Sequence, residues 1–155
     1  MSPKVYIETS VVSYRTSFPS RDIVVAAHQQ ITHAWWATRE RYDLYVSEAV
    51  LAEAGGGDPL AAARRLSALA NVPVLMITEE VATLAARFVD EGALPRKAFV
   101  DALHVATAAV HGMDYLLTWN CAHIANAKIR ATLESLCRWQ GLRPPMICTP
   151  EEILP

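Results

Sequence analysis

The chain has 155 residues, of which 52% are hydrophobic and 19% are charged. This length and composition are typical of one compact domain and exclude a chain that is disordered throughout. The formal net charge is −2, from 14 basic and 16 acidic residues, which excludes a protein held on nucleic acid by bulk positive charge. We therefore expect a single domain over residues 1–155.

Neither a membrane span nor a secretory signal is expected. No apolar run approaches the roughly 18 residues that a membrane helix needs, and residues 1–9 contain no long apolar segment. The cysteines, Cys121, Cys137 and Cys148, are odd in number and include no CxxC pair, which argues against a disulfide framework and a zinc site. We expect reduced thiols and a cytoplasmic protein.

Short apolar runs flanked by polar or turn residues predict the strands. Such runs are typical of strands that are buried on both faces of a parallel sheet. In chain order they are residues 5–7, 44–46, 74–77, 115–117 and, as the weakest pattern, 146–148.

Helical patterns with clear start signals lie between these runs. Ser20 is expected to cap a helix that extends to about Arg39. Asp58 is a cap residue followed by Pro59 at the first helical position of an alanine-rich segment. Thr78 opens another helix, with two glutamates in the first turn where the helix dipole favours acidic groups.

The pattern continues in the second half of the chain. A helix follows Pro95 and ends near Gly112, and a last short turn starts at Thr149. Alternation of strand and helix predicts an α/β fold with a parallel sheet and helices on both faces. The three glycines at residues 55–57 lack the spacing of a phosphate loop, so we interpret them as a helix end and a turn.

Oxygen-bearing side chains follow several of the predicted strands. Glu8 and Thr9 follow the first strand, Thr118 and Asn120 follow the fourth, and Glu53 lies in a helix shortly after the second. Ligands of open α/β sheets bind beyond the carboxyl ends of the strands. Carboxylate and amide oxygens gathered there are the ligands that Mg²⁺ or Mn²⁺ prefers.

Glu8 and Glu53 are the first two candidate ligands. A carboxylate at the end of a buried strand is costly to desolvate unless it is paired or binds a metal, although Glu8 could also lie in an exposed loop. Glu48 and Glu53 are five residues apart, about 140° around a helix, so they cannot both face one site. Glu48 suits the first helical turn, which leaves Glu53 as the better candidate.

Asp101 is the most informative residue. It lies in a segment, residues 97–108, that is apolar nearly all round and is therefore predicted to form a buried helix. An aspartate there needs a partner. The alternative to a metal site is a pair with a basic residue such as Lys97 or His104. For His104 itself, a structural hydrogen bond is favoured over metal ligation.

The chain resembles PIN-domain proteins, and in particular the toxin nucleases of VapC-type toxin–antitoxin modules. Four segments in this order carry the resemblance, which covers nearly the whole chain: residues 5–10, 47–53, 101–106 and 115–120. It implies a three-layer α/β/α fold with a central, mainly parallel sheet. It also implies Mg²⁺- or Mn²⁺-dependent cleavage of RNA, an antitoxin partner and a homodimer.

Carried over to this sequence, the resemblance implies three catalytic and metal-binding acids. Glu53 and Asp101 match the acids of the family, and Glu8 stands where an aspartate is usual. Asn120 replaces a common fourth aspartate, which leaves three carboxylates, enough for one divalent ion. The supporting residues are Thr9, Thr118 and Asn120. Asn120 could instead be a plain cap for the segment after it.

A metal held by these acids would neutralise charge on a phosphodiester and activate a water. The alternative is a PIN-like module that binds RNA or a protein through a weakened acid site without cutting. A small hydrolase or phosphatase is a third reading, disfavoured because no GxSxG motif is present.

Aromatic residues admit two readings. Trp35, Trp36, Trp119 and Tyr14 could stack on unpaired bases, but such residues more often fill a core or a dimer contact. The paired tryptophans favour packing and, with the apolar composition, indicate a homodimer. Because the net charge is −2, RNA affinity is expected to come from a few arginines near the strand ends.

Overall fold

The computed structural model describes all 155 residues. Its centre is one sheet of five parallel strands in the order β3-β2-β1-β4-β5. The strands are β1 (Lys4–Ile7), β2 (Asp43–Ser47), β3 (Val74–Leu75), β4 (Tyr115–Leu117) and β5 (Met146–Cys148). All five predicted strands are confirmed.

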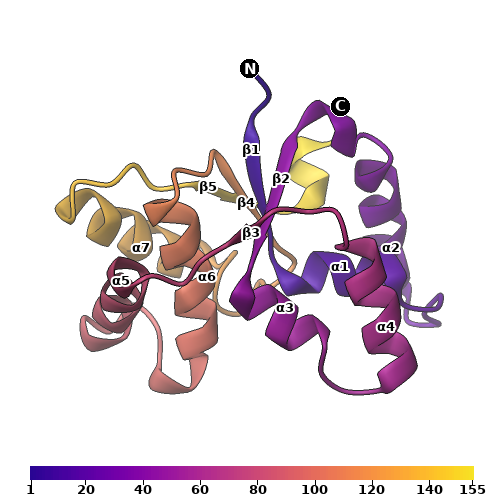
Figure 1. Cartoon of the computed structure of the whole chain (residues 1–155), viewed down its shortest axis with the longest axis horizontal. Coiled ribbons are helices and arrows are strands. Elements are labelled where there is room, and N and C mark those ends of the chain that lie inside the picture. Colours follow the sequence, from indigo (N-terminus) through magenta and orange to yellow (C-terminus); the bar gives the residue numbers. More distant parts are fainter.

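Helices cover both faces of the sheet (Figure 1). On one side lie α1 (Thr9–Thr16), α2 (Ile23–Trp36) and α4 (Pro59–Ala68), and on the other lie α5 (Glu79–Asp90), α6 (Phe99–Val110) and α7 (Ala127–Trp139). The short helix α3 (Glu48–Ala54) continues directly from β2. Three 3₁₀ turns complete the chain: η1 (Arg39–Arg41), η2 (Arg96–Ala98) and η3 (Pro150–Ile153). The predicted three-layer α/β/α fold is confirmed.

The core explains why β1 is the central strand. Val5, Tyr6 and Ile7 are all fully buried, as expected for a strand covered by helices on both faces. Trp35 of α2 and Phe88 of α5 are also fully buried, and these two helices lie on opposite sides of the sheet. Burial of each such large apolar side chain contributes about 1.5–3 kcal/mol, so the sheet forms a rigid base for the residues at its edges.

Strand β3 is shorter than predicted, because it ends at Leu75 and not at Ile77. The backbone N–H of Ile77 donates to the side chain of Glu48 at 3.2 Å, so a carboxylate takes the place of a neighbouring strand. Glu48 therefore has the structural role expected of it near the start of α3.

Most helix starts are confirmed, with one correction. The side chains of Asp58 and Thr78 accept from the backbone at the starts of α4 and α5. The prediction that Ser20 caps α2 is wrong. The cap is Asp22, whose side chain accepts from the N–H of Val25 at 2.9 Å, while the hydroxyl of Ser20 accepts from the N–H of Asp22 in the segment before the helix. This helix also ends at Trp36, three residues before the predicted end.

Helices α1 and α7 come in addition to those expected from the sequence. Helix α1 is only eight residues long and begins with Glu8 as its cap, a residue type outside the usual capping set. Helix α7 is capped by Asn126. A cap residue alone is a weak predictor of a helix when no strongly apolar segment follows it.

Two expected absences concern membranes and disulfides. None of the helices combines the length and apolar character that crossing a bilayer requires. Cys121, Cys137 and Cys148 are all free thiols, as predicted. Burial raises the pKa of Cys137 to about 11 and of Cys148 to about 12, so these two thiols are unreactive at neutral pH.

Candidate active site

Glu8 lies at the carboxyl end of β1, where the strand passes into α1. Only 4% of the residue is exposed. One carboxylate oxygen accepts from the hydroxyls of Ser10 and Thr118, the latter at 2.6 Å, and the other accepts from the Ser10 N–H at 3.1 Å. No basic side chain forms an ion pair with it. Glu8 is therefore a buried negative charge that has hydrogen bonds but no compensating cation.

Glu53 lies in the last turn of α3, beside the start of α1. Its Oε1 accepts from the hydroxyl of Thr9 at 2.5 Å and from Nε2 of His104 at 2.7 Å, while its Oε2 accepts no hydrogen bond from the protein. Burial raises the pKa of Glu53, but the hydrogen bond and charge of His104 and the hydrogen bond of Thr9 outweigh it and hold the pKa below its usual value. Glu53 is thus ionised at neutral pH, with one oxygen free.

A hydrogen-bonded chain behind Glu53 fixes its orientation. Nδ1 of His104 lies 2.7 Å from the hydroxyl of Tyr6, which lies 2.7 Å from the hydroxyl of Ser47. Ser47 also accepts from the N–H of Val50 at 3.3 Å and so caps α3, the helix that carries Glu53. Tyr6, Ser47 and His104 are all fully buried.

The protons in this chain can be assigned from chemistry. Burial raises the pKa of Tyr6 well above its usual value, so Tyr6 is a neutral phenol. Oε1 of Glu53 is an ionised oxygen and can only accept, so Nε2 of His104 carries a proton and donates it. His104 therefore makes a structural hydrogen bond to Glu53, the role that the sequence analysis favoured over metal ligation.

Asp101 lies in the first turn of α6, with 19% of its side chain exposed. Its Oδ1 accepts from the amide of Asn120 at 3.1 Å, and its Oδ2 lies 2.9 Å from Nδ1 of His123. The alternative partners considered for Asp101, Lys97 and His104, are wrong. His104 points at Glu53, and the basic partner comes from the loop after β4.

Thr118 and Asn120 connect Asp101 with Glu8. The N–H of Asn120 donates to the Thr118 hydroxyl at 2.9 Å, and this hydroxyl donates to Glu8. Oδ1 of Asn120 also accepts from the N–H of His123 at 3.1 Å, so Asn120 caps the turn after it as well as contacting Asp101. The residues after β1 and β4 and the start of α6 thus form one hydrogen-bonded group, and the group around Glu53 lies beside it.

The donor set fits a hard divalent cation. Donor atoms of Glu8, Glu53 and His104 lie within 4.8 Å of one another. Of these, Glu8 supplies uncompensated buried charge and Glu53 supplies a free oxygen, whereas Nε2 of His104 is engaged by Glu53. Asp101 joins this group through Asn120 and Thr118 and not as a direct neighbour. The residues that could hold Mg²⁺ or Mn²⁺ are therefore Glu8 and Glu53, with Asp101 beside them.

Ser10, Tyr6 and His123 belong to the cluster but were not expected in it. Tyr6 is indistinguishable in sequence from any aromatic residue of a buried strand. His123 lies in an irregular loop, where no periodicity indicates which way a side chain points. Only Ser10, two residues after Glu8, stands where a short-range hydrogen bond could have been anticipated.

The aromatic residues near the cluster pack within the chain. Trp119 stacks on His28 with ring centres 4.1 Å apart, donates its indole N–H to Thr32 at 2.7 Å and meets Tyr14 edge-on. Trp35 and Trp36 are buried. The packing interpretation is confirmed, and the paired tryptophans give no support to a dimer contact.

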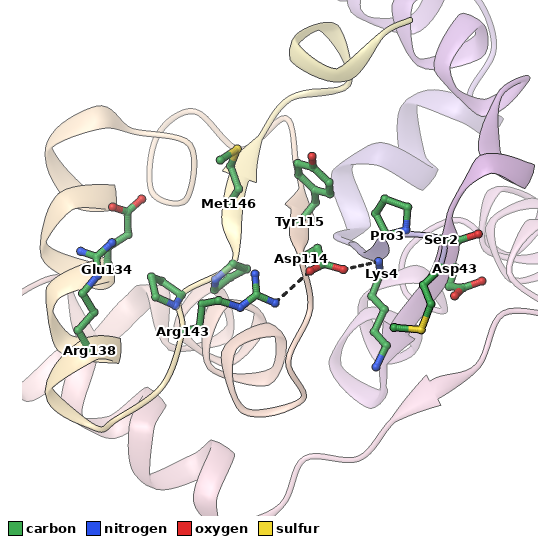
Figure 2. A pocket seen from close by; sticks show the side chains of 13 residues that line it. Ser2, Pro3, Lys4, Asp43, Asp114, Tyr115, Glu134, Arg138, Arg143 and Met146 are labelled. Atoms are coloured by element: carbon green, nitrogen blue, oxygen red, sulfur yellow. Dashed lines mark hydrogen bonds and ion pairs between the residues drawn. The ribbon is translucent and has the colours of Figure 1, made fainter.

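A large surface hollow lies elsewhere. It has a volume of about 880 Å³ and is lined by residues from the starts of β1, β2, β4 and β5, at the amino edge of the sheet (Figure 2). Its carboxylates come from Asp43, Asp114 and Glu134, and Asp114 accepts from the N–H of Lys4 at 2.8 Å and from Arg143 at 3.0 Å. These contacts hold the pKa of Asp114 below its usual value.

The matching family model is that of the PIN domain, and it covers residues 5–120. The chain belongs to the PIN domain family. The matched span begins in β1 and ends at Asn120, so it contains all three candidate acids of this PIN domain. A comparison with curated proteins gives no match.

Solved structures share the PIN fold of this chain. VapC20 from Mycobacterium tuberculosis, a sarcin-ricin loop cleaving toxin, aligns over 79% of this chain and 95% of its own, with a TM-score of 0.61 and 18% identity. A toxin–antitoxin complex from Klebsiella pneumoniae aligns over 81% and 93%, with a TM-score of 0.54 and 18% identity. VapBC2 from Rickettsia felis, bound to a promoter DNA fragment, aligns over 94% and 98%, with a TM-score of 0.54 and 11% identity.

Proposed function

We propose that this PIN domain is a divalent-metal-dependent endoribonuclease and the toxin component of a toxin–antitoxin pair. The observation that carries the proposal is Glu8, a carboxylate that is 4% exposed and has no cation beside it. A buried charge without a counter-charge is unfavourable in the isolated protein and becomes favourable when a cation binds.

The roles of the residues follow from their contacts. Glu8, Glu53 and Asp101 would hold the ion, and a bound Mg²⁺ or Mn²⁺ would supply positive charge for the phosphodiester and lower the pKa of a water. Thr9 and His104 hold Oε1 of Glu53, which leaves Oε2 without a hydrogen bond from the protein. Thr118 and Asn120 hold Glu8 and Asp101 in one arrangement.

The partners are inferred from the similar structures. VapC20 is named as a sarcin-ricin loop cleaving toxin, the Klebsiella pneumoniae structure is a toxin–antitoxin complex, and VapBC2 is bound to promoter DNA. By analogy, we expect an RNA substrate, an antitoxin protein and action in the cytoplasm. Co-purification with the product of a short reading frame immediately upstream would test the antitoxin.

A homodimer remains a separate proposal. Large apolar side chains stay exposed on the single chain, among them Phe99, Val100 and Trp139, and such surfaces favour a protein contact. Sedimentation at high concentration should show a dimer, and a strictly monomeric profile would contradict it.

The direct test of the function is RNA cleavage by the purified protein. We expect cleavage of a structured RNA in Mg²⁺ or Mn²⁺ that EDTA abolishes. Glu53→Gln should abolish cleavage, while Glu48→Gln, on the same helix but engaged with Ile77, should retain it. RNA binding without any metal-dependent cleavage would instead support the non-cutting PIN-like module.

A further inference from the structure

A second hollow lies on the side of the sheet that α1, α2 and α4 cover. It has a volume of about 1150 Å³ and lies among the α1–α2 connection, α2, η1 and α4. Its lining includes Arg15, His33, Arg39 and Arg64, but no aspartate or glutamate. We call it the arginine groove.

The three arginines of the groove are held by aromatic rings and not by carboxylates. The guanidinium of Arg64 lies 4.4 Å from the ring centre of Phe18, and those of Arg39 and Arg15 lie 5.5 and 5.9 Å from that of Trp36. None of them takes part in an ion pair. Nε of Arg64 is buried and has no hydrogen-bond partner at all.

Two other arginines of the chain have a carboxylate partner. Arg143 pairs with Asp114 and Arg96 with Asp90, whereas the hydrogen bond of Arg39 in the groove goes to the uncharged backbone carbonyl of Trp36, at 3.0 Å. The groove therefore concentrates positive charge that the protein itself does not neutralise, although the net charge of the chain is −2. Its chemical complement is an anionic chain.

The groove is connected to the acid cluster by a single helix. Helix α1 begins directly after Glu8 and ends at Thr16, which lines the groove. Arg15 lies seven residues after Glu8, roughly 10 Å along the helix axis. One extended strand of nucleic acid could therefore reach both places within a few nucleotides.

We propose that the arginine groove binds the single-stranded RNA that flanks the cleavage point, an inference that rests on the proposed ribonuclease function. Arginine forks bind phosphates, and guanidinium planes stack on unpaired bases, so the Arg64–Phe18 and Arg39–Trp36 pairs can receive bases and phosphates without sequence preference. The groove sets affinity, while the acid cluster carries the reaction.

The test is binding of a fluorescent single-stranded RNA by anisotropy, in EDTA so that nothing is cut, over a range of salt concentrations. Each of Arg15→Ala, Arg39→Ala and Arg64→Ala should weaken binding and lower the slope of log affinity against log salt by about 0.7. Arg64→Lys should keep the salt slope because it keeps the charge. Arg138→Ala, a surface arginine outside the groove, should behave as wild type.

The outcomes separate the groove from the catalytic function. Unchanged binding and slope in all three alanine variants, with thermal unfolding showing them folded, would overturn the groove proposal and leave the ribonuclease intact. Groove-dependent binding by a protein that cuts no RNA would support the groove and overturn the proposed catalysis. If a poly-glutamate peptide binds more tightly than RNA and loses affinity in the same variants, the groove serves an acidic protein segment and the RNA assignment is wrong.

Discussion

Carboxylates stand at both edges of the sheet, but their surroundings are opposite. Asp114 at the amino edge borders a large open hollow, is paired with Arg143 and has a lowered pKa (Figure 2). Glu8 at the carboxyl edge is buried and receives hydrogen bonds only from uncharged groups. Asp114 is therefore electrostatically satisfied, whereas Glu8 has no positively charged partner.

This difference indicates how to recognise the site. Hollow volume favours the arginine groove, at about 1150 Å³, and then the amino edge, at about 880 Å³, and not the carboxyl edge. A binding site for a cation, however, needs negative charge that the fold has not already neutralised. In this PIN domain the candidate acids lie at the end of β1, in the last turn of α3 and in the first turn of α6. The variants below are chosen to reverse or to sharpen the contrast.

The largest difference in RNA cleavage is expected between Asp→Asn substitutions at the two edges of the sheet. Asp101→Asn removes one of three carboxylates and should lower metal-dependent RNA cleavage by about a hundredfold or more, because a metal contributes several kcal/mol to such reactions. Asp114→Asn should leave the cleavage rate unchanged. Initial rates in Mn²⁺ measure both, and equal rates for Asp101→Asn and wild type would make Asp101 structural.

The second effect concerns the support behind Glu53. His104→Ala removes the N–H that holds Oε1 and should weaken Mn²⁺ binding by about 10–100-fold, the usual cost of losing such a partner. His104→Gln, which can still donate, should recover part of the affinity. Calorimetric titration measures this effect.

A matched control lies near the other end of α6. The side chain of His111 hydrogen-bonds to the carbonyl of Met76 and to none of the candidate acids, so His111→Ala should bind Mn²⁺ as wild type does. Because His104 is fully buried, thermal unfolding must show that the variants are folded. Folded His104→Ala with wild-type affinity would contradict a positioning role for His104.

The third effect tests Asn120, whose amide donates to Asp101 at 3.1 Å. Asn120→Asp places two carboxylates together, so the metal-free protein should lose stability through like-charge repulsion. Mn²⁺ should bind more tightly and reverse that loss, because the site gains a carboxylate. Thermal unfolding without Mn²⁺ measures the loss of stability, and thermal unfolding with Mn²⁺ measures how far the metal reverses it. Unchanged affinity would place residue 120 outside the metal's reach.

The smallest effect is a pH dependence at the amino edge. The N–H of Lys4 and Arg143 lower the pKa of Asp114, so its contribution to stability is complete above the usual aspartate pKa of 3.8 and is lost as the pH falls through the lower folded-state value. Asp114→Asn should therefore cost less than about 1 kcal/mol at neutral pH. Urea unfolding should show this difference vanish in strong acid, and a difference that grows in acid would contradict the assignment.

Much of this arrangement follows from the sequence, because the strands are short apolar runs and their order in the chain brings their carboxyl ends to one edge. Glu8, Glu53 and Asp101 could be selected on that basis. The contacts of His104 and His123 could not, because each is decided by a partner more than 20 residues away or by the path of an irregular loop. The prediction of the α2 cap was wrong for a local reason, because Ser20 and Asp22 are both good cap residues and lie only two positions apart.

The most direct test of the central claim is calorimetric titration of Mn²⁺ into wild type and Glu8→Gln. The substitution keeps the shape of the side chain and removes the buried charge, and the hydroxyls of Ser10 and Thr118 can turn to accept from the new amide. We expect wild type to bind Mn²⁺ and Glu8→Gln to bind it more than about tenfold more weakly. Equal affinity in two folded proteins would contradict the claim that uncompensated charge at the carboxyl edge forms a metal site.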